Sequence, residues 1–314
     1  MRVLVSGSTG LIGSALVEAL PAEGHEPVRL VRGAPPDDVA HVRWDPAAGE
    51  FPADGLDGID AVVHLAGEGI ATRRWNAAQK ARIRDSRVAG TTLLAEAIAA
   101  ATRPPSVLLS GSAIGFYGDR GDEMLTEESG PGHGFLAEVV RDWEAATAAA
   151  EGRSRVVHLR TGIVLSTSGG ALAEQLPFFR VGLGGRIGDG RQWWSWISID
   201  DMVGALLWLL DSDPGRTVEG AVNLTAPDAV TNAEFTRILG RVLRRPTLLP
   251  TPKPALWAKL GRELTESLLY TSARVEPAVL TGKGYRFRTD ELEPALRAVL
   301  GRPADGQAPT DTTG

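Results

Sequence analysis

The sequence of 314 residues contains no cysteine. This absence excludes disulfide bonds, thiolate metal sites and a cysteine nucleophile together, and no other metal-ligand spacing appears. Lysine is also scarce: with only four lysines, most of the positive charge is arginine, which favours forked contacts to carboxylates and phosphates. The formal net charge of −6 argues against a general nucleic-acid binder, because phosphate contacts need clustered basic side chains. We therefore expect a small-molecule substrate, no metal and no nucleic-acid partner.

Long apolar runs are missing as well. No stretch approaches the ~18 apolar residues of a membrane span, and the apolar start, residues 3–5, is too short for a signal peptide. The hydrophobic content of 43% and the charged content of 23% are ordinary for a globular protein. We therefore expect a cytoplasmic protein without a membrane partner, built as one large α/β domain with a smaller appendage. A homodimer is left open.

Short β-branched runs alternate with helical patterns in the first half of the chain. This alternation is typical of a parallel sheet with helices on both faces. Strands are predicted at residues 3–6, 27–32, 41–44, 61–66, 107–110 and 156–159. Helices are predicted at residues 11–20, 76–84, 87–101 and 135–150. The fold class predicted from this order is α/β, a Rossmann-type doubly wound parallel sheet.

The pattern changes after the last of these strands. Residues 166–196 are rich in glycine and aromatics and predict a long irregular segment, whereas a helix is expected to begin near Asp200 and another at the capping box of Thr231. We expect three parts, with the boundaries that follow. Residues 1–165 form a Rossmann domain to which 197–224 return, 166–301 form substrate-side and mostly helical C-terminal segments, and 302–314 form a disordered tail.

A glycine-rich stretch, Gly7-Ser8-Thr9-Gly10-Leu11-Ile12-Gly13, follows the first strand and opens the first helix. Glycine is needed in such a loop because a side chain would keep a pyrophosphate away from the backbone N–H groups, and the helix N-terminus adds partial positive charge. The alternative is a tight turn that holds no ligand. The predicted cofactor contacts here are Gly7, Thr9, Gly10, Leu11, Ile12 and Gly13.

The end of the second strand indicates which dinucleotide is bound. An acidic residue about 20 positions after the loop would accept the ribose hydroxyls of NAD, whereas an arginine suits a 2′-phosphate. This place holds Val31 and Arg32, and no acid occurs before Asp37. Arg32 could instead be a solvated arginine at a strand end. The sequence therefore favours NADP(H) as the cofactor.

The fourth strand ends in His64-Leu65-Ala66-Gly67-Glu68. Small residues at this place would let the backbone lie beside the adenosine ribose, so all five are predicted cofactor contacts. Taken alone, the stretch could be only a buried strand that stops at a glycine.

The G-x-x-G-x-x-G spacing of the loop resembles the short-chain dehydrogenase/reductase superfamily, whose usual chemistry needs a tyrosine and a lysine four residues later. None of the three tyrosines, Tyr117, Tyr270 and Tyr285, has a lysine at that spacing. At the head of the helix where the pair would fall stand Phe135 and Val139, which cannot transfer a proton. The catalytic pair of the superfamily is absent from this chain.

Residues 110–118, Ser-Gly-Ser-Ala-Ile-Gly-Phe-Tyr-Gly, resemble the serine-bearing strand end of sugar-nucleotide epimerases and dehydratases. The resemblance implies that Ser112 hydrogen-bonds the substrate, and Tyr117 is the tyrosine nearest the expected pocket. Ser112 and Tyr117 are therefore the candidate catalytic residues, and Ser110 is counted among the cofactor contacts. The alternative is that the serines bond the backbone and the tyrosine packs.

Several further stretches share one resemblance. They are Arg73-Arg74-Trp75-Asn76, Ser86-Arg87, residues 117–119, Phe135-Leu136-Ala137-Glu138, Trp143-Glu144, residues 159–165, residues 184–190 and residues 196–201. With the loop they resemble the atypical short-chain dehydrogenase/reductase group called epimerase family proteins, which carry a small C-terminal domain of unknown function. The resemblance implies NADP(H) contacts by Val31, Arg32, His64, Leu65, Arg87 and Arg160. It departs at Ser198, where relatives usually carry histidine.

Residues 182–196 lie where extended relatives close over a sugar nucleotide. Arginines and tryptophans there could contact an anionic or planar ligand, or the tryptophans could pack the small domain onto the Rossmann core. Two functions stay open: an NADP(H)-dependent epimerase-like or oxidoreductase enzyme acting on a small or nucleotide-linked substrate, and a non-catalytic NADP(H)-binding regulatory or redox-sensing module.

Overall fold

The computed structural model describes residues 1–33 and 40–302, so the tail predicted at 302–314 falls, from residue 303 on, outside the described residues. Its centre is a seven-stranded sheet in which every pair of neighbours is parallel, in the order β11-β7-β5-β4-β1-β2-β3. The strands are β1 (Arg2–Ser6), β2 (Glu26–Val31), β3 (His41–Arg43), β4 (Ala61–His64), β5 (Val107–Ala113), β7 (Arg155–Thr161) and β11 (Gly220–Leu224). The predicted doubly wound parallel sheet is confirmed.

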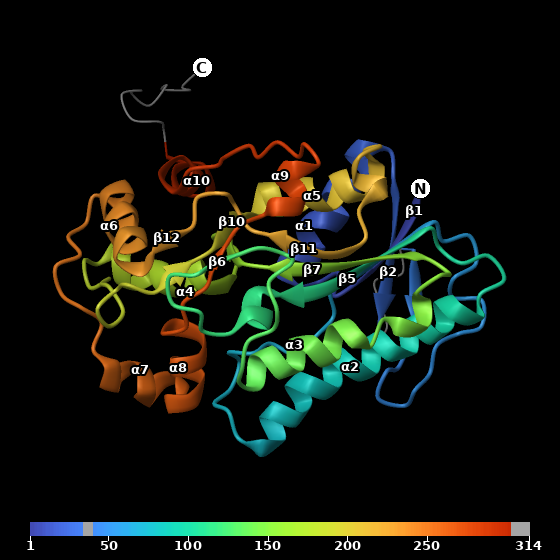
Figure 1. The fold of residues 1–314 in the computed structure, drawn as a ribbon, viewed down its shortest axis with the longest axis horizontal. Coiled ribbons are helices and arrows are strands. Elements are labelled where there is room, and N and C mark those ends of the chain that lie inside the picture. The colour runs from blue at the N-terminus through green and yellow to red at the C-terminus, as the bar shows by residue number, and fades with distance from the viewer. Residues whose placement is uncertain (34–39, 303–314) are drawn as a thin grey trace.

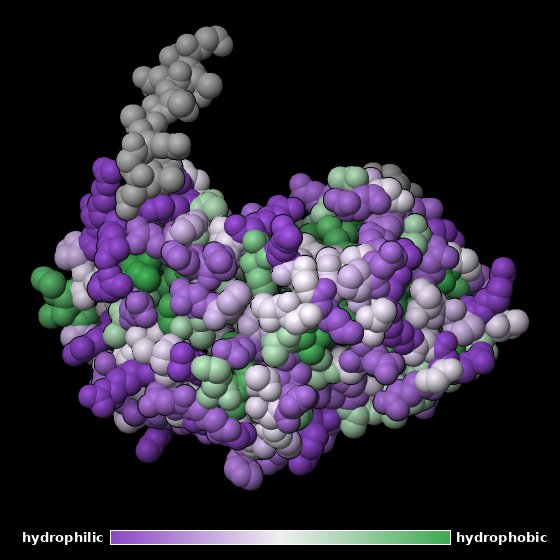
Figure 2. Space-filling model, turned by 45° about the horizontal axis from the view of Figure 1, so that its top comes forward, coloured by the Kyte–Doolittle hydropathy of each residue, from purple (hydrophilic) through white to green (hydrophobic). Residues whose placement is uncertain are grey.

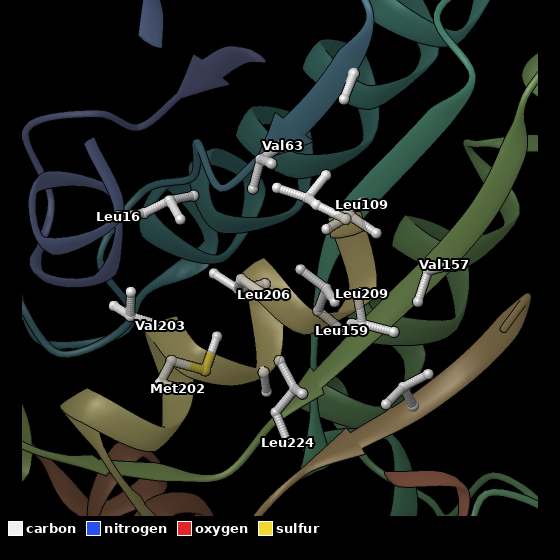
Figure 3. Packing of buried hydrophobic residues seen from close by; sticks show 14 of the residues in the cluster. Leu16, Val63, Leu109, Val157, Leu159, Met202, Val203, Leu206, Leu209 and Leu224 are labelled. Carbon is white, nitrogen blue, oxygen red and sulfur yellow. The ribbon is translucent and has the colours of Figure 1, made fainter. Parts of the chain in front are cut away.

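Helices cover both faces of this sheet (Figure 1). On one face lie α1 (Leu11–Ala19) and α5 (Ile199–Asp211), and on the other α2 (Ala77–Ala100) and α3 (Phe135–Ala145). Figure 3 shows the first interface, where Leu16 of α1 and Leu206 of α5 point at Val63 and Leu109 of the strands. Alternate residues of the same strands, such as Leu108, join the opposite core beneath α2, as the two-residue period of a strand requires.

Two features differ from the predictions. Helix α2 is continuous, not broken near Ser86, because no proline interrupts it and the Ser86 hydroxyl bonds the Ile83 carbonyl within the helix. Its one glycine, Gly90, is buried and does not end it. The segment predicted as irregular contains α4 (Gly170–Arg180), whose apolar residues at helical spacing are buried although glycine-rich flanks obscure the pattern. In addition, β5 runs three residues beyond its predicted end, so it includes Ser112.

A second core lies beside the sheet and is built from short strand pairs and helices. Strand β8 (Ile163–Leu165) pairs with β10 (Trp196–Ser198), and β9 (Trp193–Trp194) with β12 (Val230–Thr231). A third pair, β6 (Met124–Leu125) with β13 (Arg274–Val275), packs instead against Phe116 and Tyr117. Helices α4, α6 (Asn232–Leu243) and α10 (Leu292–Val299) close around Trp194, Trp196 and Phe235. The other helices are α7 (Lys253–Leu260), α8 (Arg262–Leu269), α9 (Ala278–Gly282) and the 3-10 turns Leu20–Glu23, Ile114–Tyr117, Ala148–Ala150 and Gly215–Thr217.

One buried carboxylate joins the two parts. Asp201, in the first turn of α5, accepts hydrogen bonds from the Ser198 hydroxyl (2.8 Å), the Arg288 amide (2.7 Å) and the Thr289 hydroxyl (3.1 Å). Ser198 in turn caps α5 by accepting from the Asp201 amide. The position at which relatives usually carry histidine is therefore a helix cap in this chain. Within residues 1–33 and 40–302, no helix is long and apolar enough to cross a membrane.

Candidate functional site

A cavity of about 1010 Å³ opens beside the loop that follows β1. Small-molecule sites usually enclose roughly 300–1,000 Å³, so this cavity has room for a dinucleotide. Its walls come from the ends of β1, β2 and β4 and from one face of α2. Residues lining it include Gly7 to Gly10, Arg29 to Gly33, Trp44, Pro46, Ala47, Leu65 to Glu68, Arg82, Asp85, Ser86 and Ala89. The structure thus brings together most of the predicted cofactor contacts of these three strand ends.

The loop after β1 needs glycine for close packing. Gly7 has φ +64°, and a Cβ on it would lie 2.7 Å from the Leu65 carbonyl oxygen. A Cβ on Gly13 would lie 2.2 Å from the Gly7 carbonyl oxygen, well inside any allowed contact. Helix α1 then starts at Leu11 without a side-chain cap, which leaves its first N–H groups available to an anion. This cradle fits the pyrophosphate of a dinucleotide, and Leu11 and Ile12 form the first helical turn beneath it.

The end of β2 supplies two arginines to the cavity. Arg32 is exposed at the rim, and Arg29 lines the wall with its Nη1 donating to the Ser8 carbonyl at 2.9 Å. Arg29 was not predicted as a site residue, although an arginine between the apolar residues Val28 and Leu30 of this strand could have indicated a role. Asp37, the first acid after Arg32, lies outside the described residues.

His64 stands at the end of β4 with no exposed surface. The Ser6 hydroxyl lies 2.7 Å from His64 Nδ1 and accepts the amides of Leu65 (3.0 Å) and Ala66 (3.1 Å). Since both lone pairs of Ser6 are used, its proton goes to Nδ1, and Nε2–H faces the Thr91 hydroxyl. Burial lowers the pKa of His64 to about 4. A neutral His64 therefore fixes the backbone of Leu65 and Ala66, and it reaches the cavity only through them.

Arg87 on α2 holds the turn that follows β4. Its Nη1 donates to the Glu68 carbonyl at 2.9 Å, and its guanidinium lies 5.1 Å from the Trp143 ring. A Cβ on Gly67 would lie 3.3 Å from its central carbon, so glycine leaves room for it. Burial lowers the pKa of Arg87 to about 10. Arg87 thus holds the Gly67–Glu68 backbone in place from the protein interior, not from the cavity.

A buried polar network occupies the carboxyl end of β5 and β7. The Ser112 hydroxyl donates to Glu144 Oε1 at 2.6 Å, and Arg160 holds the same carboxylate with two bonds of 2.8 and 2.9 Å. Side-chain exposure is 6% for Arg160 and 11% for Glu144. Although burial by itself opposes the charge, the bonds and charge of Glu144 raise the pKa of Arg160. Ser110, two residues earlier on β5, is wholly buried, and its hydroxyl has no hydrogen-bond partner among the residues that the structure describes.

Tyr117 continues this network and is completely buried. Its hydroxyl donates to Asn223 Oδ1 at 2.7 Å and accepts from Arg160 Nη1 at 3.1 Å. Burial raises the pKa of Tyr117 above its ordinary value, with Arg160 acting in the opposite direction. The nearby Glu127 accepts the amides of Asn223 and Val279, and burial raises its pKa too. Glu127, Glu144 and Asn223 were not assigned roles from the sequence, because only the fold brings them beside Tyr117.

The head of α3, where the superfamily places its tyrosine, is apolar. The ring of Phe135 lies 5.1 Å from that of Trp75, and Lys80 Nζ lies 4.5 Å above it. Lys80 is paired with Glu263 of α8 at 2.6 Å. This position offers no hydroxyl to a substrate.

The tryptophans of residues 182–196 mostly pack the second core. Trp194 and Trp196 are buried, and Gln192 bonds the carbonyls of Ile187 and Leu269. Trp193 is half-buried, and its indole N–H donates a hydrogen bond to the carboxylate of Asp122. Trp194 and Trp196 therefore pack, as the alternative expected, but within the second core and not onto the core of the large sheet, whereas the arginines at 186 and 191 stay exposed.

Comparison with known proteins gives concordant results. Residues 3–224 match the family model described as NAD dependent epimerase/dehydratase family, and residues 251–299 match a domain of unknown function, DUF1731. The chain is 44% identical to epimerase family protein Mb2239 of Mycobacterium bovis over 302 residues, covering 96% of this chain and 98% of the relative. It is 38% identical to human epimerase family protein SDR39U1 over 96% of this chain and all of that protein. The crystal structure of human SDR39U1 (isoform 2) with NADPH superposes with a TM-score of 0.88 at 36% identity, covering 96% of this chain and 99% of the human one.

Proposed function

The chain belongs to the NAD dependent epimerase/dehydratase family, and on this premise we propose that it binds NADP(H) in the cavity beside the β1 loop. When bound, the nicotinamide of such a cofactor accepts or donates a hydride. We propose that this chain uses it on a small or nucleotide-linked substrate. Residues 1–165 with 197–224 would bind the cofactor, and 166–301 would form the substrate side.

Arg32 at the cavity rim is the observation that carries the choice of NADP(H). A guanidinium there can bond the 2′-phosphate with two parallel N–H donors. Arg29 supports it from the wall by fixing the Ser8 carbonyl, which sets the loop that would hold the pyrophosphate. The human relative crystallised with NADPH adds independent support.

The predicted contacts would act in different ways, according to where each residue lies. Thr9, Leu11, Ile12 and Gly13 would present backbone N–H groups to the phosphates, and Gly7 and Gly10 would shape the loop, since the Gly10 amide donates to the Gly7 carbonyl. Val31, Arg32, Leu65, Ala66, Gly67 and Glu68 would line the adenosine side. His64, Arg87, Ser110 and Arg160 would support these walls from inside the protein, since each is largely buried.

Ser112 and Tyr117 are our proposed substrate-side groups, and their hydrogen bonds define what each can do. Because Glu144 takes the proton of Ser112, the serine oxygen offers lone pairs, which suits a substrate hydroxyl better than a carbonyl. Tyr117 would have to leave Asn223 to reach a ligand, and its raised pKa makes it a poor base near neutral pH. Turnover by these groups would be slow.

These contacts also favour the second candidate function, a non-catalytic NADP(H)-binding module. The specific observation is the apolar head of α3, where Phe135 replaces a proton donor, beside a cavity that keeps its cofactor features.

One assay separates the two functions. Purified protein is mixed with NADPH and a panel of carbonyl compounds and sugar nucleotides, and loss of nicotinamide absorbance is followed. For an enzyme, one compound class supports turnover, and Ser112→Ala and Tyr117→Phe lower kcat while NADPH affinity stays unchanged. NADPH binding without turnover on any compound supports the module. Absence of NADPH binding refutes the proposal in both forms.

A further inference from the structure

Large hydrophobic side chains exposed to solvent gather at one end of the molecule. Of the six in the described part of the chain, five lie on two neighbouring segments, and their exposed fractions run from 51% to 89%. They are Phe178, Val181, Leu183, Leu248 and Leu249, here called the apolar tip. Figure 2 shows hydrophobic side chains projecting at this end, which Figure 1 places near α4 and the link from α6 to α7. Such a grouping on a protein surface usually marks an interaction site.

Hydrogen bonds to backbone carbonyls hold the two segments of the tip together. The Arg245 side chain donates to the Arg180 carbonyl at 2.7 Å, and the Thr251 amide donates to the Arg186 carbonyl at 2.8 Å. The Thr251 hydroxyl also bonds the Gly185 carbonyl at 3.0 Å. Because the backbone on both sides is fixed, the apolar side chains are held outward.

The charged residues within the two segments of the tip are positive, while Glu174, four residues before Phe178, forms an ion pair with Lys259 at 3.3 Å. Arg180, Arg186, Arg244 and Arg245 stand on the two segments, and none of them forms an ion pair with any residue that the structure describes. Residues 175–188 and 244–252 contain no acidic residue, although the whole chain has a net charge of −6. An apolar surface rimmed by unpaired arginines is complementary to a partner that is both apolar and negative.

We propose that the apolar tip docks this protein on an anionic lipid surface. Projecting leucine and phenylalanine side chains can enter the region between head groups and acyl chains, and each flanking arginine strengthens partition to a negative surface by about fivefold. A second copy of the chain fits less well, because a two-fold interface through the tip would place these arginines against each other. The expectation of no membrane partner rested on the lack of a spanning segment, and a surface contact needs none.

The full-length protein is tested by flotation with vesicles of phosphatidylcholine alone and of phosphatidylcholine with phosphatidylglycerol. We expect binding to the anionic vesicles only, decreasing as salt is raised. The double variant Leu248→Ser/Leu249→Ser should bind at least about tenfold more weakly. Met124→Ser, which removes the exposed hydrophobic side chain outside the tip, should bind like the wild type. NADPH affinity and thermal unfolding serve as controls that the variants fold.

Three results would overturn the proposal. The first is no binding to anionic vesicles at low salt. The second is binding that the double serine variant leaves unchanged. The third is a wild-type dimer in sedimentation velocity that the same variant converts to monomer without any vesicle binding, because the tip would then be a self-association surface.

Discussion

Replacing Arg32 by aspartate tests the cofactor assignment at the residue that carries it. The guanidinium is exposed at the cavity rim, so its bond to a 2′-phosphate lies at the lower end of charged hydrogen bonds, about 1.5 kcal/mol. The aspartate adds repulsion: a unit charge ~6 Å from a doubly charged phosphate in water costs about 1.4 kcal/mol. Together these effects predict roughly 100-fold weaker NADPH binding.

NADH has no 2′-phosphate, so the same substitution removes no hydrogen bond between the protein and NADH. The new carboxylate can instead accept the ribose hydroxyls, as the acid of NAD-binding proteins does. We therefore expect NADH affinity to be unchanged or higher. The preference for NADPH over NADH should fall by about two orders of magnitude. This decrease should be smaller at high salt, because salt screens the charges involved.

The assay is titration of the purified protein with each dinucleotide by calorimetry. Arg103→Asp is the matched control: it makes the same change in charge at an exposed arginine before β5, at the opposite edge of the sheet. If Arg32→Asp leaves the NADPH-to-NADH ratio where it is in the wild type, the 2′-phosphate assignment is refuted.

Three further predictions follow from the packing. Gly13→Ala should abolish NADPH binding and lower the melting temperature, because its Cβ would clash with the Gly7 carbonyl, whereas Gly130→Ala, with open space around it and away from the cavity, should change neither. Glu144→Ala should lower the free energy of unfolding in urea by about 3–5 kcal/mol, because it leaves the Arg160 charge buried and unpaired; a loss below ~1 kcal/mol would contradict that. Since the folded pKa of His64 (about 4) is below the unfolded value of 6.5, the unfolded chain binds the extra proton, and stability should fall as pH falls from 6.5 to 4, by about 3 kcal/mol in all. His64→Asn should lose that part of the pH dependence, and an unchanged slope would show that another group titrates.

The cofactor half of the protein could be predicted from local sequence. The strand, the glycine loop and the helix follow one another within twenty residues, and parallel strand ends meet at one edge of a sheet, so Gly7, Arg32 and Leu65 were placed together without coordinates. The structure adds a second physical reason for the glycines, because Gly7 and Gly13 are needed for loop and strand packing.

Only the tertiary structure decided what surrounds the candidate catalytic residues. Ser112, Glu144 and Arg160 come from three elements, and their bonds depend on how α3 lies across β5 and β7. No spacing in the sequence indicates that Glu144 takes the serine proton or that Asn223, more than a hundred residues away, engages Tyr117. The sequence by itself determined the type of cofactor site, since that depends on backbone conformation and residue size. The availability of a proton depends on burial and on long-range partners, which only the folded chain defines.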